Sequence, residues 1–468
     1  MNKILLIFTI LLFFNNCSFN EKSKFWTNEV KIEKEKKQVL KKKELFADET
    51  SQQKEMNIKL KIKLQSKSIN HNYNNNKNNN GRVNYLGNLK NISKYKFKKI
   101  KYFNQFEPEI IFHDNDLIFF NNTGSIIKFN KDSDYIWQKN YYLKQEKKLN
   151  PILFFSKNKD TLVVADNISK YYAMDVNTGE LLWSRYNNAP FISDVKILDN
   201  KFFAVDSNNT IKCFSLIDGT KLWEYKSESR IIKSSKKLSI AIKDNIVIFN
   251  NSLGDITALD VNTGNLIWYT PTVKSQNLIQ SFLLKSSDLV IDNNSVLFSN
   301  NSNDFFSIDL NTGVINWIQK INSDLRPKVI NDLIFTISLE GFLVILDSKT
   351  GSILRITDIF GNSKKNIKNL DKLNPINFID GLFEKIPEDS RFYIPDEKKT
   401  KNKVRPIGFI VALDNIYLTT NNGKLYVIDI LTGQMQSILK IDKEKISRPY
   451  ISNKSMFLVK EDSIIKLN

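Results

Sequence analysis

Short runs of hydrophobic residues alternate with polar turns at a regular interval from about residue 106 to the end of the chain. Segments 173–183 (AMDVNTGELLW) and 258–268 (ALDVNTGNLIW) show the unit clearly: an apolar strand, a polar turn and a second strand that ends in tryptophan. The strands are rich in Val, Ile, Phe and Thr and alternate with a period of two, which is typical of β-strands and not of helices. The pattern therefore predicts consecutive β-hairpins.

The turn of each unit contains residue types that suit a tight reversal. An Asp or Ser at its start can bond to its own backbone, and the glycine that follows adopts positive φ without steric cost. Six units share this glycine column, and a weaker copy has Ser133 in the same place. The glycines are Gly179, Gly219, Gly264, Gly313, Gly351 and Gly433.

Tryptophan marks the second strand of the unit. Five of the six tryptophans stand four residues after the turn column: Trp137, Trp183, Trp223, Trp268 and Trp317. The column recurs every 38 to 49 residues, except for an interval of 82 residues before Gly433. Another pair of strands lies upstream of each hairpin, and four short strands per unit of this length indicate a β-propeller blade. We therefore predict an all-β fold.

The number of blades follows from the turn motifs and from the end of the chain. Seven motifs predict seven blades, and the tail 448–468 repeats the start of a blade but stops before its tryptophan strand. An open edge would remain there unless another segment pairs with it, and the alternating segment 96–103 (KFKKIKYF) can supply the missing strand. We expect an eight-bladed propeller of four-stranded antiparallel blades over 96–468, with both chain ends sharing the last blade.

The long interval before Gly433 has two interpretations. Residues 359–404 contain many charges and several prolines but no turn-plus-tryptophan column. We expect a loop insertion between blades six and seven, with a short helix near 379–386. A ninth, degenerate blade is the alternative.

The first residues have the pattern of a secretion signal. Lys3 precedes the apolar run Ile4–Phe14, whose eleven residues are too few to span a bilayer comfortably but suit a signal peptide. The run ends near Cys17, and a cysteine in this place resembles a bacterial lipoprotein signal. We expect residues 1–16 to be removed and Cys17 to be acylated, although Asn16 stands where that signal usually has a small residue. An ordinary secretory signal is the alternative.

A basic tether is expected between the signal and the propeller. The net charge is +19, and residues 1–105 hold 23 Lys and Arg against 8 Asp and Glu, so the propeller itself is close to neutral and is not predicted to bind nucleic acid. We expect residues 17–95 to be a partly disordered tether, with the run 70–80 (NHNYNNNKNNN) as a flexible linker. Its lysines suit either a solvated tether or attraction to an anionic membrane or an acidic partner.

Candidate chemistry is scarce. The chain has two cysteines, Cys17 and Cys213, two histidines, and no CxxC or other metal-ligand spacing. Cys213 stands in the small-residue column of the repeat, so we expect it to be a buried apolar side chain. The sequence predicts no catalytic residues, no metal site and no cofactor.

The A-x-D-x-x-T-G-x-x-x-W unit resembles the quinoprotein-type (PQQ-like) propeller repeat. In that family the tryptophan packs between adjacent blades, and the resemblance gives the five tryptophans of this chain the same structural role. Dehydrogenases with this repeat also carry a calcium or lanthanide ion, a catalytic Asp and usually an adjacent pair of cysteines. This chain has two distant cysteines and no recognisable acidic cluster, so an enzyme is the less favoured interpretation.

A secreted, lipid-anchored propeller of this kind is similar to the BamB family of outer-membrane assembly lipoproteins. The resemblance implies a non-catalytic scaffold that is anchored in the outer membrane and faces the periplasm. Its expected partner is the POTRA region of a BamA-like barrel protein, and its clients could include unfolded outer-membrane proteins. A scaffold of another envelope complex is the alternative.

The same resemblance suggests a partner-binding site. In the family, the loops that flank the fourth blade contact the barrel protein, and here these are residues 227–237 and 270–288. The resemblance places Ile231, Ile232 and Lys233 in the first contact and Asp288 in the second. Lys233 stands where the family has arginine, which would weaken a bidentate contact. Ordinary connections between blades are the alternative.

Overall fold

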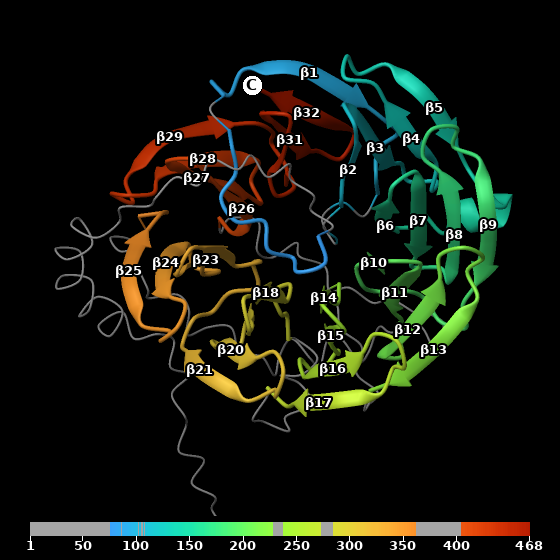
Figure 1. The fold of residues 1–468 in the computed structure, drawn as a ribbon. Helices are drawn as coiled ribbons and strands as arrows, with labels where there is room; N and C mark the ends of the chain where they lie inside the picture. Colours follow the sequence, from blue (N-terminus) through green and yellow to red (C-terminus); the bar gives the residue numbers. More distant parts are fainter. Residues whose placement is uncertain are drawn as a thin grey trace, which may run out of the picture. The chain divides into compact units, whose positions relative to one another are not determined.

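The computed structural model describes residues 75–85, 87–101, 103, 106, 108–227, 237–272, 284–361 and 404–468. These residues form eight four-stranded antiparallel sheets, arranged as the blades of a propeller around a central channel (Figure 1). The prediction of an all-β, eight-bladed propeller is therefore confirmed. A short helix, α3 (Lys144–Lys148), lies beside blade 2 at the rim, where the Tyr186 hydroxyl donates to Glu146.

Blades 1 to 7 each use a continuous stretch of chain, with strands in chain order from the channel outward. Blade 1 has β2 (Ile111–His113), β3 (Asp116–Phe120), β4 (Ile126–Phe129) and β5 (Tyr135–Lys139); blade 2 has β6 (Leu153–Asn158), β7 (Thr161–Asp166), β8 (Lys170–Asp175) and β9 (Leu181–Tyr186). Blade 3 has β10 (Lys196–Leu198), β11 (Lys201–Val205), β12 (Thr210–Ser215) and β13 (Lys221–Lys226); blade 4 has β14 (Ile240–Lys243), β15 (Ile246–Asn250), β16 (Ile256–Asp260) and β17 (Leu266–Thr270). Blade 5 has β18 (Val290–Asp292), β19 (Ser295–Ser299), β20 (Phe305–Asp309) and β21 (Ile315–Gln319); blade 6 has β22 (Lys328–Ile330), β23 (Leu333–Ile337), β24 (Phe342–Asp347) and β25 (Ile353–Asp358). Blade 7 has β26 (Pro406–Ala412), β27 (Asn415–Thr420), β28 (Lys424–Asp429) and β29 (Met435–Lys440).

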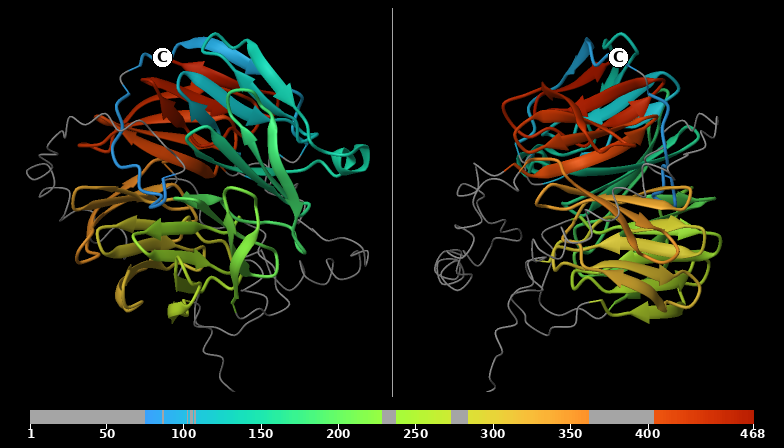
Figure 2. Two further views of the ribbon diagram at one scale, coloured as in Figure 1. Left: turned by 45° about the vertical axis from the view of Figure 1, so that its right-hand side comes forward. Right: turned by 90° about the vertical axis from the view of Figure 1, so that its left-hand side faces the viewer.

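Blade 8 joins the two ends of the propeller. Its inner strands are β30 (Tyr450–Ser452), β31 (Ser455–Val459) and β32 (Ser463–Leu467), and its outer strand is β1 (Asn91–Lys96). Figure 2 shows the red strands of this blade beside the blue strand β1. The predicted closing segment, 96–103, was therefore wrong by about five residues, since β1 pairs antiparallel with β32 and Tyr95 lies opposite Ile464.

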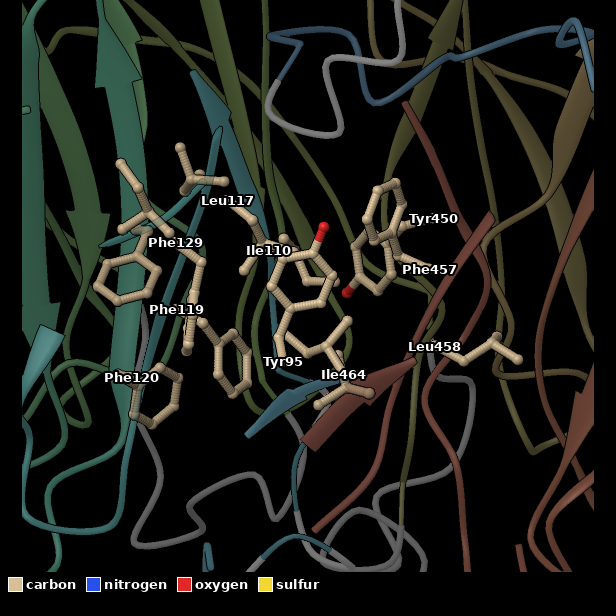
Figure 3. Packing of buried hydrophobic residues seen from close by; sticks show 14 of the residues in the cluster. Tyr95, Ile110, Leu117, Phe119, Phe120, Phe129, Tyr450, Phe457, Leu458 and Ile464 are labelled. Atoms are coloured by element: carbon tan, nitrogen blue, oxygen red, sulfur yellow. The ribbon is translucent and has the colours of Figure 1, made fainter. Parts of the chain in front are cut away.

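The physical reason for that error is that both segments bury apolar residues. Phe97, Ile100 and Phe103 are buried, but they belong to the connection that leads from β1 into blade 1. Tyr95 anchors β1 instead: its ring centroid lies 5.5 Å from that of Phe129 in blade 1 and 6.2 Å from that of Phe457 in blade 8 (Figure 3). The closing strand thus ties the last blade to the first.

A repeated joint connects each of the first five blades to the next. The tryptophan of the outer strand lies over the turn glycine of the following blade, and its indole N–H donates to a turn carbonyl there. The bonds are Trp137 to Asn177 O (3.0 Å), Trp183 to Leu216 O (3.0 Å), Trp223 to Val261 O (3.1 Å), Trp268 to Leu310 O (2.8 Å) and Trp317 to Ser348 O (3.2 Å). A Cβ on Gly264 would lie 2.7 Å from the Trp223 ring, and φ of Gly264 is +73°, so glycine is required there.

Other side chains make the joint where the tryptophan column ends. In blade 6, Arg355 takes the place of tryptophan and its guanidinium donates to the carbonyls of Ile430 and Leu431 in blade 7. Burial lowers the pKa of Arg355 to about 10, partly opposed by the charge of Asp429. In blade 8, the Tyr95 hydroxyl donates to Lys131 O in the turn of blade 1. The same joint is therefore made by three different side-chain types.

The asparagine-rich run does not have the structure that its composition predicted. Residues 75–80 are described, and the segment lies in one mouth of the channel, visible as the blue trace near the middle of the ring (Figure 1). Asn78 is fully buried and Asn80 nearly so. The expectation of a flexible linker was wrong for these residues, because the side-chain amides of Asn76, Asn78 and Asn79 bond to the inner strands.

Several other predictions concern residues outside the described part of the chain. They include the signal peptide, Cys17, the tether up to residue 74, the helix near 379–386 and most of the insertion at 359–404. Within the described residues, no helix is long and apolar enough to cross a membrane.

Replacing one joint tests its contribution to stability. Trp268→Ala should lower the free energy of unfolding by about 3–5 kcal/mol, since the indole is only 7% exposed and its removal leaves a cavity beside Gly313. Urea unfolding of the purified chain measures this change. Ile217→Ala is the matched control, because Ile217 is 75% exposed in the turn of blade 3, and it should change stability by less than about 0.5 kcal/mol. Equal losses in both variants would contradict the role of the joint.

Candidate functional site

Charged side chains gather in the channel, where the chain enters the inner strands. We call this group the axial ring. Its members are Glu109, Asp194, Lys237, Asp288, Arg326 and Arg448, and each lies one to three residues before an inner strand. All six are largely buried.

The ion pairs of the axial ring cross the channel. Arg448 of blade 8 lies 3.3 Å from Asp288 of blade 5 and 3.2 Å from Glu109 of blade 1. Lys237 of blade 4 lies 2.9 Å from Glu109 and also pairs with Asp194 of blade 3. Arg326 Nη2 is 2.6 Å from Asp288. Blades that do not touch one another at the rim are therefore joined through the axis.

Three of these side chains are each held in position by the serine that precedes them. Ser193, Ser287 and Ser447 each precede a ring residue, and their hydroxyl oxygens accept backbone N–H groups of Val205, Ser299 and Val459 at 2.7–2.9 Å. The same hydroxyls donate to the carbonyl of the next residue. This local structure holds the following side chain, which is Asp194, Asp288 or Arg448, at the axis. A serine followed by a charge just before an inner strand marks these three positions in the sequence.

Burial and charge have opposite effects on the ring carboxylates. Burial raises the pKa of Asp194, and the charge of Lys237 only partly offsets this. Burial also opposes ionisation of Glu109, but the charges of Lys237 and Arg448 outweigh it and lower the pKa of Glu109 to about 2. Of these two carboxylates, Glu109 is the one whose charge the network stabilises.

Two lysines lie one layer deeper in the channel. Burial lowers the pKa of Lys196 to about 8, although Asp194 opposes the shift, and burial holds the pKa of Lys328 well below its ordinary range. The ring itself contains three basic and three acidic side chains. The positive and negative charges of the ring therefore balance, and the lowered pKa values of the two lysines favour their neutral forms. Such a balance stabilises a buried network, because uncompensated buried charge is costly.

Little open space remains beside the ring. A cavity of about 10 Å³ is lined by Lys237, Asn250, Ser252 and Ser286 among others, which is room for about one water molecule. In the described ranges, no group of three or more His, Cys, Asp or Glu side chains is arranged to hold a metal ion. Cys213 is buried in β12, and burial raises the pKa of its thiol to about 12.

Of the four residues that were expected to contact a partner, the structure describes one, Asp288. Ile231, Ile232 and Lys233 lie outside the described residues. Asp288 is only 7% exposed, and its carboxylate pairs with Arg326 and Arg448. It was expected beside an exposed interface, but it is a member of the axial ring. The reason is that Asp288 stands at the start of an inner strand, where the channel and not the solvent surrounds the side chain.

The family model of outer membrane protein assembly factor BamB matches residues 122–357. This chain belongs to the BamB family. The match covers the five tryptophans of the joints and four members of the axial ring, Asp194, Lys237, Asp288 and Arg326. No curated protein matches the chain in sequence.

Solved structures share the fold of this BamB-family chain. BamB from Moraxella catarrhalis has a TM-score of 0.59 and 14% identity, covering 81% of this chain and 100% of that one. The computationally designed Ika8 protein has a TM-score of 0.57 and 12% identity, covering 80% and 99%. The quinohemoprotein alcohol dehydrogenase ADHIIG from Pseudomonas putida has a TM-score of 0.55 and 9% identity, covering 82% and 76%. At these identities the likeness concerns the fold alone.

The lowered pKa of Glu109 gives a pH-dependent prediction. Its ordinary pKa is 4.5, so ionised Glu109 contributes stability above about pH 4.5, and this contribution is lost as the pH falls toward 2. The wild-type chain should therefore be more stable than Glu109→Gln at pH 7, and the difference should shrink between pH 4.5 and pH 2. Urea unfolding midpoints across this range measure it. Asp199→Asn, in an exposed turn, is the control and should follow the wild type. A Glu109→Gln difference that does not vary with pH would refute the assignment.

Proposed function

We propose that this chain is a non-catalytic scaffold of the machinery that folds and inserts β-barrel proteins into the outer membrane. The observation that carries the proposal is the BamB family match over residues 122–357. The eight-bladed fold agrees with it, since the whole of a solved BamB superposes on the chain. A scaffold needs a rigid body with accessible loops, and eight blades locked through their rims and their axis provide one.

The partner that we propose is the POTRA region of a BamA-like barrel protein, bound through residues 231–233. The charges of the axial ring support this choice of face. The segment with Ile231, Ile232 and Lys233 re-enters the described structure at Lys237, and the segment after blade 4 re-enters at Leu284, shortly before Asp288. Both Lys237 and Asp288 are fixed in the ring. We therefore assign Asp288 a positioning role below the contact surface rather than a direct contact.

The proposed location is the periplasmic side of the outer membrane, with the chain held by acyl groups on Cys17. More than one acyl chain is needed for a stable anchor, and acylated lipoproteins meet this condition. The basic tether between Cys17 and the propeller would leave the domain free to reach a partner. The alternative function is a scaffold of another envelope complex. It would have the same anchor and would differ only in the protein that it binds.

Recovery of the partner tests the proposal and its site together. The full chain, purified from membranes in mild detergent, should recover the large barrel protein, and the triple change Ile231→Glu, Ile232→Glu and Lys233→Glu should reduce this recovery at least about tenfold, since buried charge opposes an apolar contact. Mass spectrometry of the eluted proteins measures it. Ile217→Glu is the matched control, because Ile217 is 75% exposed in the turn between β12 and β13, at the opposite end of β13 from Lys226.

Each result of that experiment has a clear meaning. Recovery of other envelope proteins without the barrel protein would overturn the proposed function. Undiminished recovery by the triple variant would overturn the site but leave the function. Tight binding of a quinone with redox activity after addition of calcium would instead support a dehydrogenase.

The anchor has a separate test. We expect the mature N-terminus to be Cys17 carrying diacylglycerol, and Cys17→Ser should release the chain from the membrane fraction, because methylene burial then no longer holds it. Mass spectrometry of the N-terminal peptide and fractionation measure the two effects. Cys213→Ser is the control, since the Cys213 thiol is buried in blade 3. An unmodified Cys17 would show that the signal is an ordinary secretory one.

A further inference from the structure

The N-terminal segment 75–83 occupies the mouth of the channel at the far end from the axial ring. Its backbone bonds to the inner strands: Ile242 N–H donates to Asn76 O at 2.7 Å and Ile291 N–H donates to Lys77 O at 2.9 Å. Ile242 lies in β14 and Ile291 in β18, and each of these strands is hydrogen-bonded to a neighbouring strand on its outer side only. The segment therefore uses backbone groups on strand edges that face the channel.

Asn78 is the centre of this contact. Its amide nitrogen donates to Ile240 O at 2.9 Å and to Leu289 O at 2.8 Å, and its amide oxygen accepts from Lys196 Nζ at 2.5 Å. The residue is 0% exposed. One asparagine thus joins blades 3, 4 and 5, and both halves of its amide are used.

The other end of the segment adds to blade 7. Val83 forms a parallel bridge with Ala412, in which Val83 N–H donates to Val411 O at 2.9 Å and Leu413 N–H donates to Val83 O at 3.1 Å. Arg82 donates to Leu413 O at 2.6 Å and pairs with Asp414 at 2.9 Å. Backbone pairing of an extended segment with a strand edge is a common way in which proteins bind peptides.

Polar contacts hold residues 75–82 of the segment, and Val83 at its end is buried in the apolar core. Residues 75–82 contain asparagines, one lysine, one glycine and one arginine, with no large apolar side chain. A hydrogen bond contributes only about 0.5–1.5 kcal/mol net, so this segment should open more easily than the apolar blades around it. The inner strands would keep their shape when it leaves, because β14, β18 and β26 remain paired within their own blades.

We propose that the channel mouth is a peptide-binding groove, that residues 75–83 are its built-in occupant, and that an extended, asparagine-bearing segment of another polypeptide replaces them. The groove recognises asparagine because an aspartate could accept from Lys196 but could not donate to Ile240 and Leu289. This site does not include residues 231–233, although Asn78 reaches Lys196, two residues after Asp194, and Leu289, next to Asp288.

The test uses the full chain and a fluorescent synthetic peptide with the sequence of residues 74–84. In Asn78→Asp, hydrogen exchange of the Ile242 and Ile291 amides should accelerate, and the peptide should bind at least about tenfold more tightly than to the wild type, because the built-in occupant no longer competes. Fluorescence anisotropy measures the affinity. A peptide with Asp in place of its own Asn78 should bind weakly.

Controls and a second variant keep the result decisive. Asn84→Asp makes the same chemical change at the exposed position directly after the segment and should behave as the wild type. Asn78→Ala removes the three side-chain hydrogen bonds without adding a charge. It replaces Asn78→Asp in both measurements if that variant does not fold. Unchanged amide exchange in both Asn78 variants would overturn the role of Asn78. Accelerated exchange without tighter peptide binding would overturn the groove.

Discussion

The structure depends on closing a ring of blades through contacts that differ in chemistry but share one geometry. In blades 1 to 6 and in blade 8, a side chain of the outer strand reaches the turn of the next blade and donates a hydrogen bond there. Five indoles, the guanidinium of Arg355 and the phenol of Tyr95 all do this. The last of these residues comes from β1, so the ring closes only when the N-terminal strand joins blade 8. Every other feature, including the channel, exists because this ring is closed.

The fold could be predicted because the residues that form the joint recur at the same positions of the sequence repeat. The joint requires a glycine at positive φ and a tryptophan four residues later, and this pair recurs in several repeats of the sequence. Closure is a single event and has no repeat to confirm it. The alternating pattern suited both β1 and the segment after it, and the pairing of β1 with β32 and the contact of Tyr95 with Phe129 distinguish them. The sequence pattern therefore predicted correctly that an N-terminal strand completes blade 8, but it indicated the wrong segment.

The axial ring and the asparagine segment were missed for a related reason. Burial of Asp288 or Asn78 results from several blades meeting at one axis, whereas sequence patterns describe one blade at a time. A charged residue beside a polar loop suggests exposure, and an asparagine run suggests disorder. Both expectations fail when partners arrive from distant blades, as Arg448 does for Asp288 and Lys196 does for Asn78. The signals were present as Ser193-Asp194, Ser287-Asp288 and Ser447-Arg448, but their meaning needed the closed ring.

The two ends of the channel are closed by interactions that differ in whether another chain segment could replace them. At the ring end, removing Lys237 breaks the ion pair of buried Asp194, and removing Asp288 breaks that of buried Arg326, so loss of either residue should be strongly destabilising. At the other mouth, amides and carbonyls of the occupying segment bond to strand edges, and any extended backbone with the right side chain can make the same bonds. Lys196 connects the ends, since it lies below Asp194 and donates to Asn78. A rigid end and an exchangeable end in one channel would allow the propeller to hold its loops in place while its mouth changes occupant.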